Sequence, residues 1–171
     1  PSTCISLGIG QDALLITPIQ MANLGALIAN KGYYKTPHIV KQINNNCIDS
    51  LFLQKKYGSI SKEHFDPVIY GMQTAIEGEF GTAKLGKIDN ITVCGKTGTA
   101  QNNSGDDHSI FMAFAPKINP KIAIAVYIEN GGWGSEVAVP IGSLCIEKYI
   151  NRDVEREKLE SMMINKYIVY K

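Results

Sequence analysis

Two apolar segments without alternation constrain the fold of this chain more than any other feature. They are residues 109–115 and 121–129, and Pro116-Lys117-Ile118-Asn119-Pro120 joins them. A strand that is apolar on both faces needs a covering layer on each side of its sheet. The sequence therefore predicts a central antiparallel hairpin with helices on both faces, which is an α+β fold.

The first covering helix begins at Thr17-Pro18-Ile19-Gln20. Threonine can cap a helix, proline suits the first helical position, and a glutamine in the first turn can complete a capping box. The helix should end at Gly32. Because apolar residues leave it little polar face, we expect it to be buried on most sides.

Two further helices and a short hairpin complete the expected elements. We expect the second helix to begin with Ser61 or Asp66 as its cap and to end within residues 77–81. One apolar face of it should be buried, formed by Val68, Ile69, Met72, Ala75 and Ile76. Residues 38–43 and 47–53 predict a modest hairpin. Ser135 can cap a last helix, whose first turns Pro140 should disturb. From residue 151 the charged composition predicts a solvated tail or a surface helix.

Composition and charge exclude several functional classes. The chain has 171 residues, 44% hydrophobic content and a formal net charge of +1. That length and content support one core. The charge is too small for the attraction on which binding to nucleic acid or an anionic membrane depends. No apolar run reaches the roughly 18 residues of a membrane span, so we expect this chain neither to span nor to enter a membrane.

The four cysteines give no metal-binding signal. Cys4, Cys47, Cys94 and Cys145 form no close pair and have no histidine at ligand spacing. A zinc site is therefore not expected, and nothing in the sequence calls for a cofactor. Four cysteines permit three pairings, among which the sequence does not choose, and small buried thiols are the simpler interpretation.

The main functional signal is a polar cluster on a predicted strand, Cys94-Gly95-Lys96-Thr97-Gly98-Thr99-Ala100-Gln101. Alternation puts Thr97 and Thr99 on one face, and Gly98 lets a ligand or another backbone approach. Two hydroxyls, a nearby ammonium and the Thr99 amide can bind a carboxylate and a developing oxyanion. Alternation points Lys96 the other way, so its participation requires a twist or a bulge. An ordinary edge strand with an exposed lysine is the alternative.

Two nucleotide-binding motifs are matched only in part. Gly95-Lys96-Thr97 spells the end of a P-loop, but Asn90 stands where its first glycine is required. Residues 8–13 satisfy a dinucleotide fingerprint, but residues 28–34 lack the acidic residue expected about 20 positions on. We interpret Gly8 and Gly10 as turn residues.

Two other segments contain the letters of catalytic motifs. Asp107-His108-Ser109 has the residues of a triad, but neighbours on a strand point to opposite faces. We expect His108 to hold its loop by hydrogen bonding. Ser59-Ile60-Ser61-Lys62 matches the S-x-x-K nucleophile motif. It follows an exposed-looking connection, so two serines at a helix cap are the simpler interpretation.

A series of motifs in a fixed order resembles one family. The series is Gly8-Ile9-Gly10-Gln11, Thr17-Pro18-Ile19-Gln20-Met21-Ala22, Gly81-Thr82-Ala83, Gly95-Lys96-Thr97-Gly98-Thr99-Ala100-Gln101, Asp107-His108-Ser109, Phe114-Ala115-Pro116 and Glu129-Asn130-Gly131-Gly132. From about residue 8 to residue 150 the chain resembles the C-terminal part of the transpeptidase domain of class B penicillin-binding proteins. Within them it is most similar to the elongation type, penicillin-binding protein 2. Each motif alone is weak, but the ordered series is specific.

The resemblance implies a DD-transpeptidase of peptidoglycan synthesis with the DD-peptidase/β-lactamase-like fold. Such an enzyme acylates its serine with a D-Ala-D-Ala stem peptide, releases D-Ala and passes the acyl group to a second stem peptide; β-lactams acylate the same serine. Carried onto this chain, Lys96 holds the electrostatics of the cleft, and Thr97, Gly98 and Thr99 bind the carboxylate. The Thr99 amide supplies half of the oxyanion hole. The family also implies an inner-membrane anchor, with this domain in the periplasm or at the cell exterior.

The chain departs from the family in the order of its motifs. In the family, the S-x-x-K and S-x-N motifs precede the segment that Gly8-Ile9-Gly10-Gln11 resembles, whereas Ser59-Ile60-Ser61-Lys62 follows it. We therefore expect residues 1–150 to be an incomplete transpeptidase domain without the acylating serine, followed by a charged segment over residues 151–171. We also expect that penicillin does not label this chain alone.

Two functions of different classes follow from these residues. In the first, the chain works when it is joined to the missing N-terminal part of the same protein, with stem peptides and β-lactams as ligands. In the second, it is a non-catalytic module that binds a peptide or a partner. The first also predicts uncovered apolar surface on the helix of residues 17–29, unless another chain covers it.

Overall fold

The computed structural model describes residues 8, 10, 14–44, 46–102 and 104–168. Its central layer is an antiparallel sheet in the order β5-β6-β7, formed by β5 (Cys94–Ala100), β6 (His108–Ala115) and β7 (Ile122–Ile128). β6 pairs with β5 from Cys94↔Phe114 to Ala100↔His108, and with β7 from Ser109↔Ile128 to Ala115↔Ile122. The predicted hairpin is therefore confirmed as β6 and β7.

Within the described sheet, β6 is central and β7 lies at an edge. β6 lies between two strands, whereas β7 has a strand on one side only among the described residues. The side chains of β7 are accordingly half-buried, while β6 carries the fully buried Phe111 and Phe114. Because helices contact β7 on both faces, its apolar run reflects two covering layers rather than a central position.

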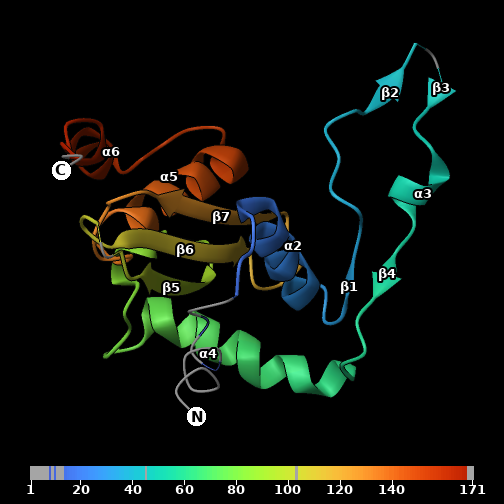
Figure 1. Cartoon of the computed structure of the whole chain (residues 1–171), viewed down its shortest axis with the longest axis horizontal. Coiled ribbons are helices and arrows are strands. Elements are labelled where there is room, and N and C mark those ends of the chain that lie inside the picture. The colour runs from blue at the N-terminus through green and yellow to red at the C-terminus, as the bar shows by residue number, and fades with distance from the viewer. Residues whose placement is uncertain (1–7, 9, 11–13, 45, 103, 169–171) are drawn as a thin grey trace.

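Helices cover both faces of the sheet, as Figure 1 shows. α2 (Pro18–Ala29) and α4 (Phe65–Glu77) pack on one face, and α5 (Ala138–Asn151) packs on the other. The face under α2 and α4 buries Ile28, Phe65, Ile69, Met72, Cys94 and Phe114. The face under α5 buries a larger cluster that includes Val93, Phe111, Ala113, Val139 and Ile146. This arrangement confirms the α+β class.

α2 begins as its sequence predicts. Thr17 Oγ1 accepts from the Gln20 N–H at 3.4 Å, and the Thr17 N–H donates to Gln20 Oε1 at 2.8 Å, which completes the capping box. The expected burial on most sides is wrong, because Ile19 and Leu24 are 58% and 45% exposed. The prediction of uncovered apolar surface on this helix is confirmed.

The capping predictions for α4 are wrong. Its N-cap is His64, which makes no side-chain cap bond. Ser61 precedes a 3₁₀ turn, η1 (Lys62–His64), and makes none either. Asp66 lies inside the first turn of α4, where its carboxylate pairs with the Lys31 ammonium. A carboxylate in the first turn still interacts favourably with the helix dipole.

The α5 helix also begins differently from the prediction. Its N-cap is Val137 rather than Ser135, and the Ala138 N–H donates to the buried Ser109 hydroxyl on β6 at 3.0 Å. Pro140 lies in the first turn, where backbone N–H groups lack helical acceptors, so it does not disturb the helix. A tertiary contact therefore takes the place of the local cap.

Between α2 and α4 the chain leaves the body as an arm, residues 33–58 (Figure 1). β1 (Tyr33–Tyr34) pairs with β4 (Lys56–Tyr57) at its base, and β2 (Gln42–Ile43) pairs with β3 (Asn46–Cys47) near its tip. The predicted hairpin is confirmed for this short pairing. The expected strand over residues 47–53 gives way to α3 (Ser50–Leu53), because Asp49 caps it by accepting from the Leu51 N–H at 2.9 Å.

A buried ion pair joins the end of the chain to the body. Glu147 of α5 is 1% exposed, and its carboxylate accepts from Arg156 Nε at 2.8 Å. Arg156 Nη1 also donates to the carbonyls of Leu85 and Lys87, next to the 3₁₀ turn η2 (Lys84–Gly86). The short helix α6 (Glu157–Ile164) follows directly. Among the described helices, none has both the length and the apolar character to cross a bilayer.

Candidate active site

The polar cluster lies on β5, one of the two edge strands among those that the structure describes. Its register against β6 is regular, with Lys96 opposite Met112, Thr97 opposite Phe111 and Thr99 opposite Ser109. Thr97 and Thr99 therefore share the face of the sheet that α5 covers, as predicted from alternation. Gly95 is required here, because a Cβ at this position would lie 2.6 Å from the Phe111 ring.

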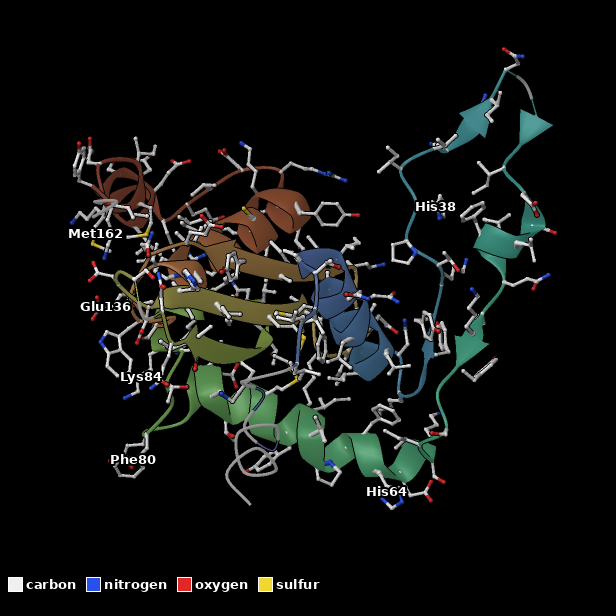
Figure 2. The ribbon with its side chains drawn as sticks, in the orientation of Figure 1. His38, His64, Phe80, Lys84, Glu136 and Met162 are labelled. Carbon is white, nitrogen blue, oxygen red and sulfur yellow. The ribbon has the colours of Figure 1, made fainter. Side chains whose placement is uncertain are left out.

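A cleft of about 380 Å³ opens over the threonines. Its walls come from three parts of the chain: β5, the turn after α4 and the loop between β7 and α5. The lining residues are Thr82, Lys96, Thr97, Gly98, Thr99, Trp133, Gly134 and Ser135. Figure 2 shows Phe80, Lys84 and Glu136 at this end of the molecule. All four residues that the sequence singled out thus line one cleft.

Lys96 reaches this cleft without a bulge in the strand. The pairing of β5 with β6 is uninterrupted through residues 94–100. The exposed lysine side chain turns back on the strand, and its Nζ donates to the Thr97 carbonyl at 2.6 Å. The length and flexibility of lysine therefore achieve what we expected to require a twist or a bulge.

Thr82 is a cleft residue to which the sequence assigned no role. Its Oγ1 lies 3.1 Å from Thr97 Oγ1, so the two hydroxyls are hydrogen-bonded. The turn that presents it is tight: the Ala83 N–H donates to the Ala75 carbonyl at 2.8 Å, and a Cβ on Gly81 would lie 2.5 Å from that carbonyl oxygen. Gly81-Thr82-Ala83 was visible as a motif, but its position beside β5 depends on tertiary structure.

The loop after β7 closes the other side of the cleft. Gly134 lies so close to β5 that a Cβ on it would be 2.5 Å from the Gly98 carbonyl oxygen. The buried Ser109 hydroxyl donates to the Trp133 carbonyl at 3.1 Å and so fixes this loop to β6. The Trp133 side chain is 66% exposed at the cleft. The sequence did not predict this position, because it showed only a lone tryptophan in a glycine-rich loop.

The residues of Asp107-His108-Ser109 have separate structural roles. Asp107 accepts from the Asn102 N–H at 3.2 Å, and His108 Nδ1 accepts from the Asn130 N–H at 3.1 Å. Ser109 supports the helix and loop described above. His108 does hold a loop by hydrogen bonding, but through Asn130 it is the loop after β7 and not the one that precedes His108, and the three side chains form no relay.

Three other nucleophilic side chains are placed where they cannot serve the cleft. Ser59 and Ser61 precede α4 and are exposed, and Figure 2 shows the neighbouring His64 at the far end of α4 from Phe80. Cys94 begins β5, but it is fully buried. Burial raises the pKa of its thiol from 9.0 to about 11, although nearby Lys117 lowers it, so the thiol stays protonated at neutral pH.

The cleft suits an anion and a polarised carbonyl. It offers hydroxyl donors and one flexible ammonium, a set that binds carboxylates well. Backbone amides of an edge strand can stabilise an oxyanion at little cost in reorganisation. Among the described residues, no group of three or more His, Cys, Asp or Glu side chains could hold a metal ion.

Comparison with known proteins identifies the family. The family model of the penicillin-binding protein transpeptidase domain matches residues 2–147. The chain therefore belongs to the penicillin-binding protein transpeptidase family. Within that family it is of the penicillin-binding protein 2 type, with similarity to MrdA and to solved PBP2 structures.

Several relatives show the extent of the similarity. Peptidoglycan D,D-transpeptidase MrdA of Haemophilus influenzae is 31% identical, over 86% of this chain and 26% of its own length. PbpA of Mycolicibacterium smegmatis is 30% identical, over 81% of this chain and 30% of its own.

Solved structures give the same result. Pseudomonas aeruginosa PBP2 in complex with WCK 5153 matches with a TM-score of 0.74 and 37% identity, covering 88% of this chain and 34% of that one. The imipenem acyl-enzyme of penicillin-binding protein A from M. tuberculosis has a TM-score of 0.71 and 30% identity, covering 85% and 33%. The chain thus spans about a quarter to a third of the length of these relatives.

Proposed function

We propose that this chain is the C-terminal part of a peptidoglycan DD-transpeptidase domain and forms one wall of its acyl-transfer cleft. The observation that carries the proposal is the convergence of Lys96, Thr97 and Thr99 in one cleft on an edge strand. The names of its relatives, which are peptidoglycan D,D-transpeptidases and β-lactam acyl-enzymes, support the same chemistry.

Each residue has a defined role in this proposal. Thr97 and Thr99 bind the carboxylate of the stem peptide or β-lactam, and Gly98 contributes its backbone to the same stretch of the cleft. The Thr99 amide donates to the oxyanion that forms as the carbonyl is attacked. Lys96 supplies the positive charge of the cleft. Thr82 orients the Thr97 hydroxyl, because the two oxygens are 3.1 Å apart.

The acylating serine lies, in this proposal, in an N-terminal part of the same protein outside residues 1–171. Support comes from the cleft, whose described lining includes Ser135 but no serine paired with a lysine in an S-x-x-K motif. We assign residues 1–150 to the transpeptidase domain and residues 151–171 to a segment beyond it, in keeping with the family match over residues 2–147. A membrane anchor elsewhere in the protein would hold this domain in the periplasm or at the cell exterior.

A fluorescent penicillin tests the proposal. The full-length protein encoded by the gene should form a covalent adduct that survives denaturing electrophoresis, while residues 1–171 alone, shown to be folded by circular dichroism, should not. Lys96→Ala in the full-length protein should slow acylation by about a hundredfold, because removing one preorganised electrostatic group has effects of that order. Lys87→Ala, an exposed lysine outside this cleft, serves as the matched control.

Two results would contradict the proposal. A stable adduct at Ser59 or Ser61 of the isolated chain would place the nucleophile within these residues. If the Lys96→Ala variant and the wild type were acylated at the same rate, the cleft would not take part in acylation. The chain would then be better described as a non-catalytic module that binds a peptide or a partner.

A further inference from the structure

The arm, residues 33–58, is a structural feature that the proposed acyl transfer does not use. None of its residues lines the cleft over β5. It is held at its base, where the Gly58 N–H donates to the Gly32 carbonyl at 2.9 Å and the Tyr33 and Tyr57 rings lie 6.1 Å apart. From there it extends away from the sheet and its helices (Figure 1).

Large apolar side chains are exposed along the arm, from its middle to its tip. They are Ile39, Val40, Ile43, Leu51, Phe52 and Leu53, and Ile39 is fully exposed. Single exposed apolar residues need no explanation, but a concentration of them on one projecting element marks an interaction site. Near the tip, the polar Gln42 and Asn44 flank the exposed Ile43.

The arm is also the most one-sided part of the chain in charge. It contains Lys35, Lys41, Lys55 and Lys56 but only one acidic residue, Asp49. The whole chain is nearly balanced, with 17 basic and 16 acidic residues. A basic surface around apolar side chains is complementary to a segment that carries both acidic and apolar residues.

An open hollow of about 330 Å³ lies between the two limbs of the arm. His38, Ile39, Val40 and Lys41 line it from the outgoing limb, and Ile48 and Leu53 line it from the returning limb. No backbone hydrogen bond joins His38, Ile39 or Val40 to another described residue. Unpaired backbone groups beside an apolar hollow can pair with the backbone of an extended peptide.

We propose that the arm is a docking site for an acidic, amphipathic segment of a partner protein, bound in an extended conformation between its limbs. Apolar side chains of that segment enter the hollow between Val40 and Leu53, and its carboxylates pair with Lys41 and the lysines nearer the base. A membrane surface fits less well, because it offers no backbone groups to pair with those of His38, Ile39 and Val40 in the outgoing limb. The inference is independent of the acyl-transfer chemistry.

A defined peptide probe tests this proposal on the full-length protein. The probe is a fluorescein-labelled peptide in which leucine and glutamate alternate, and its binding is followed by fluorescence anisotropy. The double variant Ile39→Glu with Lys41→Glu should weaken binding by at least about tenfold, because it places acidic groups where the probe is acidic. Ile118→Glu with Lys121→Glu is the matched control: both residues are exposed, but they lie in the turn between β6 and β7.

The outcomes separate the possibilities. Binding that weakens only in the arm variant and falls with added salt supports the proposal. Failure of the probe to bind, equal binding of a leucine–lysine counterpart, or equal weakening by both double variants overturns it. Arm-dependent binding to phosphatidylglycerol vesicles, with none to the probe, would identify a membrane instead. Acylation by penicillin, measured on the same variants, should stay unchanged and reports separately on the cleft.

Discussion

Thr97 stands at the centre of the cleft, since its hydroxyl meets Thr82 on one side and shares a face with Thr99 on the other. We expect Thr97→Val in the full-length protein to slow acylation by penicillin by about tenfold or more. Valine keeps the branched shape but removes a hydrogen bond to a carboxylate, which is worth roughly 1.5–3 kcal/mol. Thr92→Val, just before β5, is the control. A similar loss in both variants would mean that the strand, not the hydroxyl, had been disturbed.

Two glycines near the cleft should respond in opposite ways to the same added methyl group. A Cβ on Gly81 would lie 2.5 Å from the Ala75 carbonyl oxygen, whereas nothing lies within 4 Å of one on Gly71, inside α4. Gly81→Ala should destabilise the protein by about 2 kcal/mol, and Gly71→Ala should stabilise it by roughly 0.5–1 kcal/mol. Urea unfolding measures both. If both variants changed the free energy of unfolding in the same direction, the tight packing of the turn at Gly81 would be contradicted.

Single positions show where the sequence was sufficient and where it was not. Alternation along a strand is a local property, so the common face of Thr97 and Thr99 followed directly from it. The conformation of a long side chain is not local, which is why the reach of Lys96 around the strand was missed. Thr82 and Trp133 come to the cleft through a turn and a loop whose positions depend on packing against β5 and β6.

At the scale of elements, the Glu147–Arg156 pair determines how the charged end of the chain attaches. We expect Glu147→Ala to cost about 3 kcal/mol in the free energy of unfolding, because it leaves the Arg156 guanidinium without its buried partner. Lys148→Gln, which breaks the exposed pair with Asp153, should leave the urea midpoint unchanged. Equal destabilisation by Glu147→Ala and Lys148→Gln would show that burial does not determine how much an ion pair contributes to the free energy of unfolding.

Elements with strong periodicity were predictable, whereas their boundaries were less so. Burial requires apolar residues at regular positions, and this pattern is visible in the sequence. It predicted the apolar runs of β6 and β7 and the apolar face of α4. A cap needs only one acceptor, and tertiary structure can supply it from elsewhere. Ser109, distant in sequence, bonds the first N–H of α5 and makes Ser135 unnecessary. In the arm, Asp49 turned an expected strand into a helical turn.

On the scale of the whole molecule, unpartnered surface gathers on the α2 side of the sheet. β7 has an open edge among the described strands, and Leu15 and Ile19 are exposed near the start of α2. A hollow of about 430 Å³ lies between this segment and the sheet, lined by apolar residues that include Leu14, Met21 and Ile110. A surface of this kind is expected where another part of a protein packs.

Exposed residues of α2 should therefore behave in opposite ways in the isolated chain and in the full-length protein. Ile19→Lys with Leu24→Lys should reduce the fluorescence of a dye that binds apolar surface when residues 1–171 are studied alone, because both side chains are exposed there. The same change should lower the thermal midpoint of the full-length protein by at least about 5 °C, because covering two lysines without partners is costly. Ile118→Lys, exposed in the turn between β6 and β7, should change neither measurement. If the double variant leaves the full-length protein as stable as the wild type, no other part of the protein covers α2, and the proposal that the remainder of the domain packs on this face fails.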